Sequence, residues 1–169
     1  MELPSGLPRT SFSGRVYRVV RRGADPLSLQ GSTSRGGRYN RPGTGALYTS
    51  LEAETATAEV VRGLRLRGID PEVFGPEDWW QYEIMVEAGK ILDLTAPDTL
   101  AQLGVAAVEL TTHDDSGTRA LADGARSAGY QGILAPSAAF SGKTNLVLFL
   151  DTLTQPVEVL SSIPAPLMG

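Results

Sequence analysis

The spacing of apolar residues divides the chain into predicted strands and helices. Short runs rich in β-branched and aromatic side chains predict strands, because such side chains fit a pleated, half-buried surface. These runs cover residues 15–21, 46–49, 80–86, 90–94, 131–135, 145–150 and 157–160. Apolar residues that recur every three or four positions predict helices over residues 49–67, 99–108 and 116–128.

The remaining segments are predicted to be irregular, and they are rich in Gly, Pro and Ser. Residues 1–14 are expected to form a loose leader, residues 71–79 a turn region and residues 161–169 a tail. Residues 22–45 contain six glycines and two prolines and predict a long loop, a kind of segment that is usually functional or mobile. Strands and helices do not alternate regularly, which favours a single α+β domain over residues 15–160 rather than a doubly wound parallel sheet.

Composition narrows the classes of function. With 15 Lys and Arg against 19 Asp and Glu, the net charge of -4 argues against direct binding of nucleic acid. The absence of cysteine excludes thiolate ligands, and the single histidine, His113, excludes a cluster of histidine ligands, so we expect no metal site. The N-terminus does not resemble a signal peptide, and the longest apolar run, residues 146–150, is too short to span a bilayer. We therefore expect a cytoplasmic protein without membrane contact.

Residues 35–43, Arg-Gly-Gly-Arg-Tyr-Asn-Arg-Pro-Gly, are the most informative stretch. Adjacent glycines let the backbone approach a ligand closely, and Arg38 beside them can present a planar fork to a phosphate or carboxylate. The alternative is a mobile, arginine-rich surface loop. Tyr48 lies at the end of a predicted strand, where its ring can stack on a flat ligand or simply fill the core.

The helix predicted over residues 49–67 begins with a capping box between Thr49 and Glu52. Glu59 lies at the edge of its apolar stripe and is flanked by the small residues Ala56 and Gly63, which leave room for a ligand. The alternative is a surface ion pair between Glu59 and Arg62 at the i+3 position.

Ser137 follows Pro136 directly after a predicted strand, where it can contact a substrate or cap a turn. No nucleophile elbow surrounds it. Residues 141–144, Ser-Gly-Lys-Thr, resemble the end of a phosphate-binding P-loop. The first glycine of that motif is replaced by Ser137, and a strand rather than a helix is predicted to follow, so we exclude a P-loop.

Five motifs in order resemble the RES-domain family of toxins from bacterial toxin–antitoxin pairs. They are Arg-Val-Tyr-Arg ending at Arg18, Gly-Gly-Arg-Tyr-Asn around Arg38, Leu-Tyr-Thr-Ser around Tyr48, Thr-Ala-x-Glu ending at Glu59, and Gly-Ile-Leu-Ala-Pro-Ser ending at Ser137 with Asn145 downstream. The resemblance spans residues 15–150. Two positions depart from the family pattern: Tyr39 stands where Trp is common, and Val19 stands where some members have an aromatic residue.

This resemblance implies a fold similar to the ADP-ribosyltransferase toxins, with two small mixed or antiparallel sheets that are flanked by helices and enclose an NAD+ pocket. It also implies cleavage of the nicotinamide–ribose bond of NAD+ by phosphorolysis or hydrolysis, with NAD+ as substrate, inorganic phosphate as the alternative acceptor to water, and no cofactor. Glu59 would stabilise the oxocarbenium-like ribose. Arg18 and Arg38 would hold phosphate groups, Tyr48 would stack near nicotinamide, and Ser137 would orient the ribose or the nucleophile. Tyr39 and Asn145 would also contact the substrate.

By the same resemblance, the expected partner is an antitoxin of the Xre type with a helix-turn-helix fold, in a homo- or hetero-oligomer. Two other functions stay open at this point. The chain can transfer ADP-ribose to a macromolecule, or it can be a non-catalytic module that binds NAD+ or an ADP-ribose group.

Overall fold

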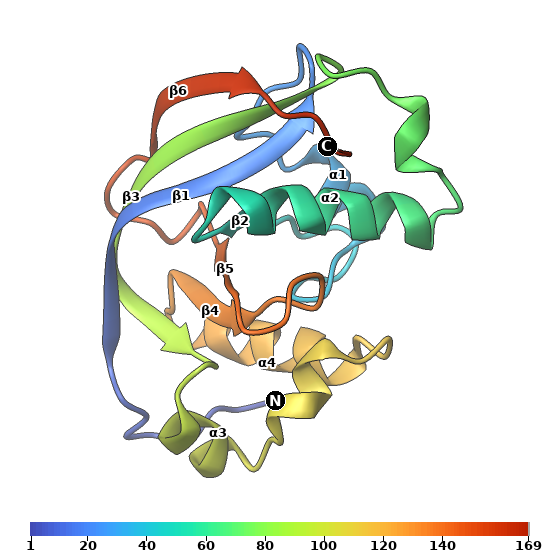
Figure 1. The fold of residues 1–169 in the computed structure, drawn as a ribbon. Helices are drawn as coiled ribbons and strands as arrows, with labels where there is room; N and C mark the ends of the chain where they lie inside the picture. Colours follow the sequence, from blue (N-terminus) through green and yellow to red (C-terminus); the bar gives the residue numbers. More distant parts are fainter. Residues whose placement is uncertain (169) are drawn as a thin grey trace.

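The computed structural model describes residues 1–168, in which six strands form one connected sheet (Figure 1). The strands are β1 (Thr10–Arg21), β2 (Leu47–Ser50), β3 (Trp79–Asp93), β4 (Gly132–Pro136), β5 (Thr144–Leu148) and β6 (Glu158–Pro164). The α-helices are α1 (Gln30–Arg35), α2 (Ala53–Leu66), α3 (Pro97–Leu103) and α4 (Ser116–Ser127), with short 3₁₀ turns at Pro71–Val73 and Ala107–Thr111.

The sheet closes on itself through its longest strand. Its order is β1-β2-β5-β4-β3-β6, and β1 pairs with β3 as well as with β2. The first part of β3 pairs antiparallel with β1 and β6, whereas residues 91–93 pair parallel with β4. The α+β class is confirmed, and the two expected small sheets are joined along β3.

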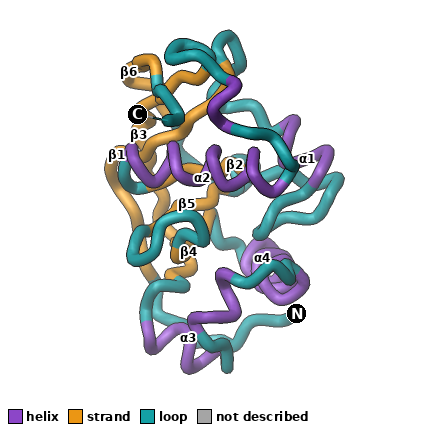
Figure 2. Tube along the Cα trace, turned by 45° about the vertical axis from the view of Figure 1, so that its right-hand side comes forward, coloured by secondary structure: helices purple, strands orange, loops and turns teal. Residues whose placement is uncertain are grey.

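The helices pack on different parts of this sheet (Figures 1 and 2). The apolar stripe of α2 rests on Val19 of β1 and Trp79 of β3. Helix α4 packs Leu121 against the part of the sheet that carries Ile133. A third cluster is formed by buried residues of β1, β2, β3 and β5; its members are Val16, Leu47, Ile84, Val86, Ala88, Ile91, Leu146 and Leu148.

Several predicted boundaries differ from the structure because pairing over long distances overrides local signals. Strand β1 begins at Thr10, five residues before the predicted start. The segments predicted as separate strands over 80–86 and 90–94 form one strand, because residues before and after Gly89 both pair with β1. Strand β6 continues to Pro164, beyond the predicted end at residue 160.

Helix boundaries differ for related reasons. The predicted capping box at Thr49 is wrong, because Thr49 belongs to β2 and its Oγ1 donates to the carbonyl of Leu146 on β5 at 2.7 Å. Helix α2 therefore begins at Ala53. The segment predicted as a loop over 22–45 contains the short helix α1. Helix α3 ends at Leu103, because Gly104 adopts the left-handed conformation with φ of 67°.

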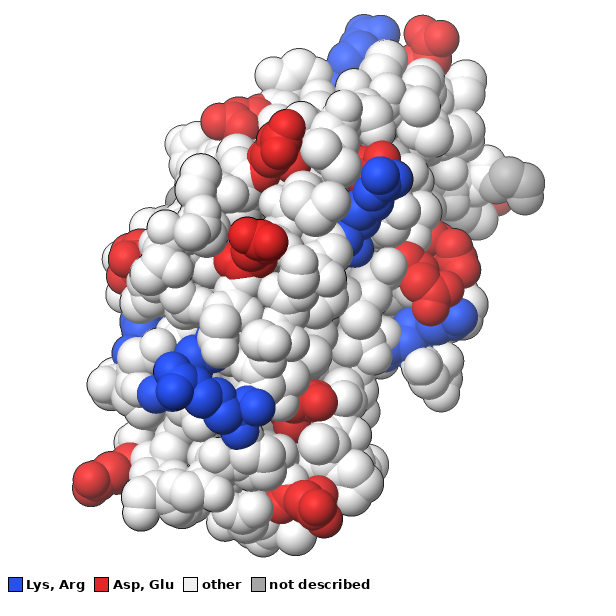
Figure 3. All heavy atoms as spheres, turned by 90° about the vertical axis from the view of Figure 1, so that its left-hand side faces the viewer, with Lys and Arg blue, Asp and Glu red and all other residues white. Residues whose placement is uncertain are grey.

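Among residues 1–168, no helix has the length and the apolar character needed to cross a membrane. Figure 3 shows one face of the molecule, on which uncharged residues predominate and charges of both signs are scattered.

Candidate functional site

A cleft of about 360 Å³ collects residues from β1, α1, β2, α2, β4 and β5. We call it the arginine cleft, because four arginines line it and Glu59 is the carboxylate among its lining residues; the arginines are Arg18, Arg35, Arg38 and Arg62. Of the seven site residues predicted from sequence, six line the cleft: Arg18, Arg38, Tyr39, Tyr48, Glu59 and Asn145. The seventh, Ser137, lies between the lining residues Pro136 and Ala138.

Glu59 is held at the wall of the cleft by a polar chain. Asn145 Nδ2 donates to Glu59 Oε2 at 2.8 Å, and Ser50 Oγ donates to Asn145 Oδ1 at 2.8 Å. Burial raises the pKa of Glu59, while the hydrogen bond from Asn145 and the positive charge of Arg62 oppose that rise. The alternative ion pair between Glu59 and Arg62 does not form. The carboxylate accepts a hydrogen bond from Asn145 instead.

Arg18 brings a positively charged group into the cleft. Its Nη1 is buried and has no hydrogen-bond partner among the described residues. Burial lowers the pKa of Arg18 to about 10, and the negative charge of Asp25 partly offsets that effect. The guanidinium therefore stays protonated at neutral pH and has a donor free for an anionic or carbonyl acceptor.

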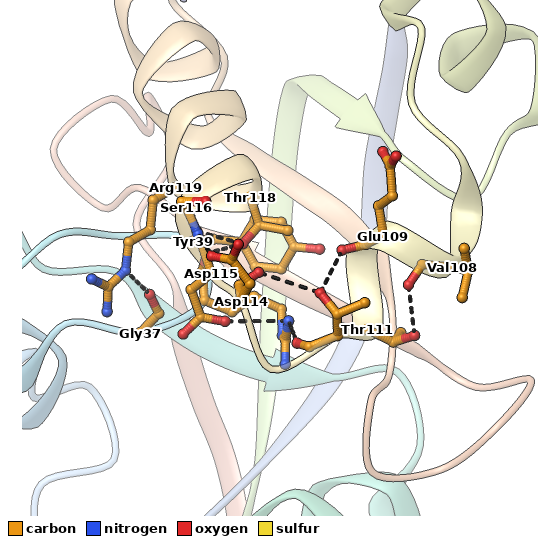
Figure 4. A network of polar contacts seen from close by, with 12 residues as sticks. Gly37, Tyr39, Val108, Glu109, Thr111, Asp114, Asp115, Ser116, Thr118 and Arg119 are labelled. Atoms are coloured by element: carbon orange, nitrogen blue, oxygen red, sulfur yellow. Dashed lines mark hydrogen bonds and ion pairs between the residues drawn. The ribbon is translucent and has the colours of Figure 1, made fainter.

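The loop that carries Arg38 is anchored to α4 and its preceding turn (Figure 4). Arg38 Nη1 donates to the carbonyl of Thr112 at 2.6 Å and lies 3.2 Å from Asp115 Oδ1, with 14% of the side chain exposed. The carbonyl of Arg38 accepts from Thr118 Oγ1 at 2.6 Å, and Arg119 Nε donates to the carbonyl of Gly37 at 2.9 Å. These contacts hold the loop in place. They also occupy one nitrogen of the Arg38 guanidinium, Nη1.

Tyr48 ties β2 to the same loop. Its hydroxyl donates to Asn40 Oδ1 at 2.7 Å and accepts from the backbone N–H of Tyr39 at 2.9 Å. A Cβ at Gly37 would clash with the Tyr48 hydroxyl, which explains the glycine at this position. Tyr39 is 3% exposed and packs in the core beside α4, with its hydroxyl buried and unpartnered among residues 1–168. Burial raises the pKa of both phenols.

Ser137 caps the turn between β4 and β5. Its Oγ accepts from the backbone N–H groups of Ala139 and Phe140 at 3.1 and 3.0 Å, and the side chain is nearly buried. The sequence left two roles open for Ser137, capping a turn and contacting a substrate. In the structure its side chain caps the turn. The strand β5 follows directly, so the rejection of a P-loop at residues 141–144 is confirmed.

Sequence reasoning missed Arg35 and Ser50 and gave Arg62 no role in a site. Ser50 pairs in register with Asn145, a relationship that cannot be seen before the strands are aligned. Within the described part of the chain, no group of three or more His, Asp or Glu side chains is placed to hold a metal ion.

Comparison with known proteins places this site in a family. Residues 15–167 match the model of the RES domain. The chain belongs to the RES domain family. A curated relative described as "Probable NAD(+) phosphorylase Rv3189", from Mycobacterium tuberculosis, is 33% identical over 136 residues, which are 76% of this chain and 61% of the relative. The match thus spans about three fifths of that relative's length.

A solved structure also resembles this RES domain. It is the crystal structure of the M. tuberculosis MbcT–MbcA toxin–antitoxin complex, with a TM-score of 0.81 and 26% identity over 94% of this chain and 87% of the matched chain. The fold and the family expected from the five motifs are therefore confirmed, and the arginine cleft lies within the part of the chain that matches the family.

Proposed function

We propose that this RES domain binds NAD+ in the arginine cleft and cleaves its nicotinamide–ribose bond. The observation that carries the proposal is the buried, unpartnered Nη1 of Arg18 in a cleft that also presents the carboxylate of Glu59. A pyrophosphate offers the acceptor oxygens that such a guanidinium lacks. The name of the M. tuberculosis relative, an NAD(+) phosphorylase, supports the same substrate.

In the proposed reaction, departure of nicotinamide leaves positive charge on the ribose, and the carboxylate of Glu59 stabilises that charge. Asn145 holds the carboxylate in place. Arg18 binds phosphate oxygens, and Arg38 contributes the nitrogens that Thr112 and Asp115 do not engage. Tyr48 acts through its ring and through the loop that its hydroxyl fixes. Ser137 acts through the turn that positions Pro136 and Ala138 at the cleft.

We further propose inorganic phosphate as the acceptor. Arg38 is paired with Asp115, which leaves Arg18, Arg35 and Arg62 around a single carboxylate. Their charges balance Glu59 and the two phosphate charges of a dinucleotide, so the positive charge that develops on the ribose as nicotinamide leaves favours an anionic acceptor over neutral water. In this reaction, a phosphate oxygen forms a bond to the anomeric carbon of the ribose, and the C–N bond electrons leave with nicotinamide.

The test is phosphorus and proton NMR of an NAD+ digest, with and without phosphate. We expect free nicotinamide and a ribose-1-phosphate-type product whose formation requires phosphate. Glu59→Gln should lower turnover at least 100-fold, whereas Glu54→Gln, on the exposed start of the same helix, should leave turnover unchanged. Wild-type turnover in Glu59→Gln would contradict the mechanism. Label from NAD+ recovered on protein or nucleic acid would instead indicate ADP-ribose transfer.

A cytoplasmic NAD+ consumer needs a partner that restrains it, and we propose an antitoxin of the Xre, helix-turn-helix type. The support is the similarity to a toxin crystallised with its antitoxin. Expression of the chain in bacteria should arrest growth and lower NAD+, and co-expression of a neighbouring gene that encodes such a protein should restore both. Normal growth and normal NAD+ with the active chain alone would contradict this proposal.

A further inference from the structure

Two arginines of the loop between α1 and β2 form ion pairs with aspartates at the start of α4 and within it. Arg38 Nη1 lies 3.2 Å from Asp115 Oδ1, and Arg41 Nε lies 2.6 Å from Asp123 Oδ2. Arg38 lines the arginine cleft, whereas Arg41 is half exposed and is not among the residues that line it. The pair between Arg38 and Asp115 is therefore the one that can act on a ligand in the cleft.

This pair uses one nitrogen of the Arg38 guanidinium. Nη1 carries two N–H groups and has two acceptors, the carbonyl of Thr112 at 2.6 Å and the carboxylate of Asp115. Within residues 1–168, Nε and Nη2 of Arg38 make no hydrogen bond. These two nitrogens present parallel N–H groups along one edge of the guanidinium, which is the geometry that binds two oxygens of a phosphate at once.

The carboxylate of Asp115 does not serve the helix that it precedes. Asp115 is the N-cap residue of α4, a position where an aspartate commonly accepts a hydrogen bond from the first turn. Its side chain makes no such bond, and the backbone N–H of Ser116 donates to Asp114 Oδ1 at 2.9 Å instead. Within the described part of the chain, the contact with Arg38 is the one polar interaction of the Asp115 carboxylate.

The backbone of the loop is fixed by other side chains of α4 (Figure 4). Thr118 Oγ1 donates to the carbonyl of Arg38 at 2.6 Å, and Arg119 Nε donates to the carbonyl of Gly37 at 2.9 Å. Removal of the Asp115 side chain should therefore leave the loop in place and release only the guanidinium of Arg38.

We propose that Asp115 is a positioning residue. It holds Nη1 of Arg38 so that the edge formed by Nε and Nη2 is presented to the arginine cleft as a bidentate site for phosphate oxygens. The identity of the ligand, the pyrophosphate of NAD+, rests on the proposed function. Asp115 carries the same sign of charge as this ligand, so Coulomb repulsion alone predicts that its removal strengthens binding. Positioning predicts the opposite.

Calorimetric titration with ADP-ribose tests the proposal without any need for turnover. We expect Asp115→Ala to bind ADP-ribose about 10-fold more weakly than the wild type. Asp115→Asn keeps an acceptor oxygen for Nη1 and should lose less. Asp123→Ala is the matched control, because it also removes one negative charge and an ion pair between α4 and the loop, and it should bind like the wild type. Unchanged or tighter binding in Asp115→Ala, or an equal loss in Asp123→Ala or Asp115→Asn, would overturn the proposal.

A double variant separates positioning from any effect of Asp115 on the stability of α4. Arg38→Met alone should weaken the binding of ADP-ribose. Addition of Asp115→Ala to Arg38→Met should weaken it no further, because no guanidinium is left to position. A second loss of the same size in the double variant would overturn the proposal. If Asp115→Ala does not fold, Asp115→Ser replaces it in both comparisons, because serine is also a favourable N-cap residue and its side chain is shorter.

The two proposals fail in different ways. ADP-ribose affinities that follow the expected order in a protein that leaves NAD+ intact refute only the proposed activity. Consumption of NAD+ with equal ADP-ribose affinity in the wild type and Asp115→Ala refutes only the role of Asp115. A wild type that binds no ADP-ribose refutes both.

Discussion

Asn145 on β5 donates a hydrogen bond to Glu59 on α2 at 2.8 Å, across 86 positions of the chain. Ser50 sets the direction of this contact, because its hydroxyl donates to the amide oxygen of the same asparagine. The amide nitrogen is thereby turned toward the carboxylate. A donor to the ionised form favours ionisation, whereas burial disfavours it, so the pKa of Glu59 depends on this amide.

Asn145→Ala should shift the pH dependence of NAD+ turnover. The pKa of Glu59, already raised by burial, rises further when the donor to its ionised form is removed. Because the proposed mechanism needs the ionised carboxylate, the acidic limb of kcat/KM should move to higher pH. Ser50→Ala should move it in the same direction by less. Ser161→Ala is the control, because Ser161 donates to a different carboxylate, that of Glu83. An acidic limb shared by Asn145→Ala and the wild type would contradict the role given to this amide.

Glu59→Gln should stabilise the fold in a pH-dependent way. The folded protein binds the Glu59 proton more tightly than the unfolded chain does, because burial raises the pKa above its ordinary value of 4.5. The resulting stability is fully present below 4.5 and is lost as pH rises through the folded pKa. Glutamine carries no such proton, so the variant should gain on the wild type in Tm as pH rises from 4 to 7. A constant difference in Tm over this range would count against the raised pKa.

Arg18→Met should separate stability from binding. Removing a buried donor without a partner relieves a cost of about 1–3 kcal/mol, so the free energy of unfolding should rise by about 1 kcal/mol or stay level. Affinity for ADP-ribose should fall at least 10-fold, which corresponds to about 1.4 kcal/mol. Arg15→Met on the same strand is the control, because Arg15 is exposed and surface ion pairs such as the one it forms with Glu83 contribute little to stability. Calorimetry and denaturant unfolding measure both quantities, and full affinity in Arg18→Met would refute its role.

Tyr48→Phe should loosen the loop while keeping the aromatic ring. The change leaves the buried N–H of Tyr39 without its acceptor and Asn40 without its donor, at a cost of about 1–3 kcal/mol. We expect a lower Tm and a several-fold rise in the KM for NAD+ with a smaller change in kcat. Tyr82→Phe serves as control, because Tyr82 lies outside the arginine cleft. An unchanged Tm and KM would show that the hydroxyl does not hold the loop.

Ser137 variants can distinguish turn capping from contact with substrate. Ser137→Ala removes the acceptor for two backbone N–H groups and should lower stability by about 1–2 kcal/mol, with reduced turnover. Ser137→Asp keeps an acceptor but, when ionised, no hydroxyl hydrogen. If the serine acts only through the turn, the Asp variant should recover most of both losses. Recovery of Tm without recovery of turnover would instead assign the hydroxyl hydrogen a direct contact with the reacting groups.

Local patterns predict much of the fold. The helix expected over 116–128 is observed as α4, because its apolar face is regular and Gly129, with φ of 82°, ends it. The same patterns fail at Gly89, where a glycine between two apolar runs looks like a break. Pairing with β1 keeps the backbone extended there, and a partner strand dozens of residues away cannot be read from a local window.

The candidate site shows the same division. The chemistry-bearing residues can be named from their types and motifs, and six of the seven predicted residues do meet in one cleft. Their roles cannot be named in this way. Whether Arg18 has a counterion, and whether Arg38 is engaged by Asp115, depends on segments that the fold brings together. Ser50 is invisible for the same reason, since its position opposite Asn145 follows from strand register.

The unbroken course of β3 limits how this protein can move. The same strand belongs to the part of the sheet that carries α2 and to the part that carries α4, so a continuous strand rather than a flexible linker joins the two walls. Entry is left to loops and side chains at the rim. If this domain cleaves NAD+ as proposed, a partner would silence it by covering the opening of the arginine cleft rather than by changing the shape of the domain.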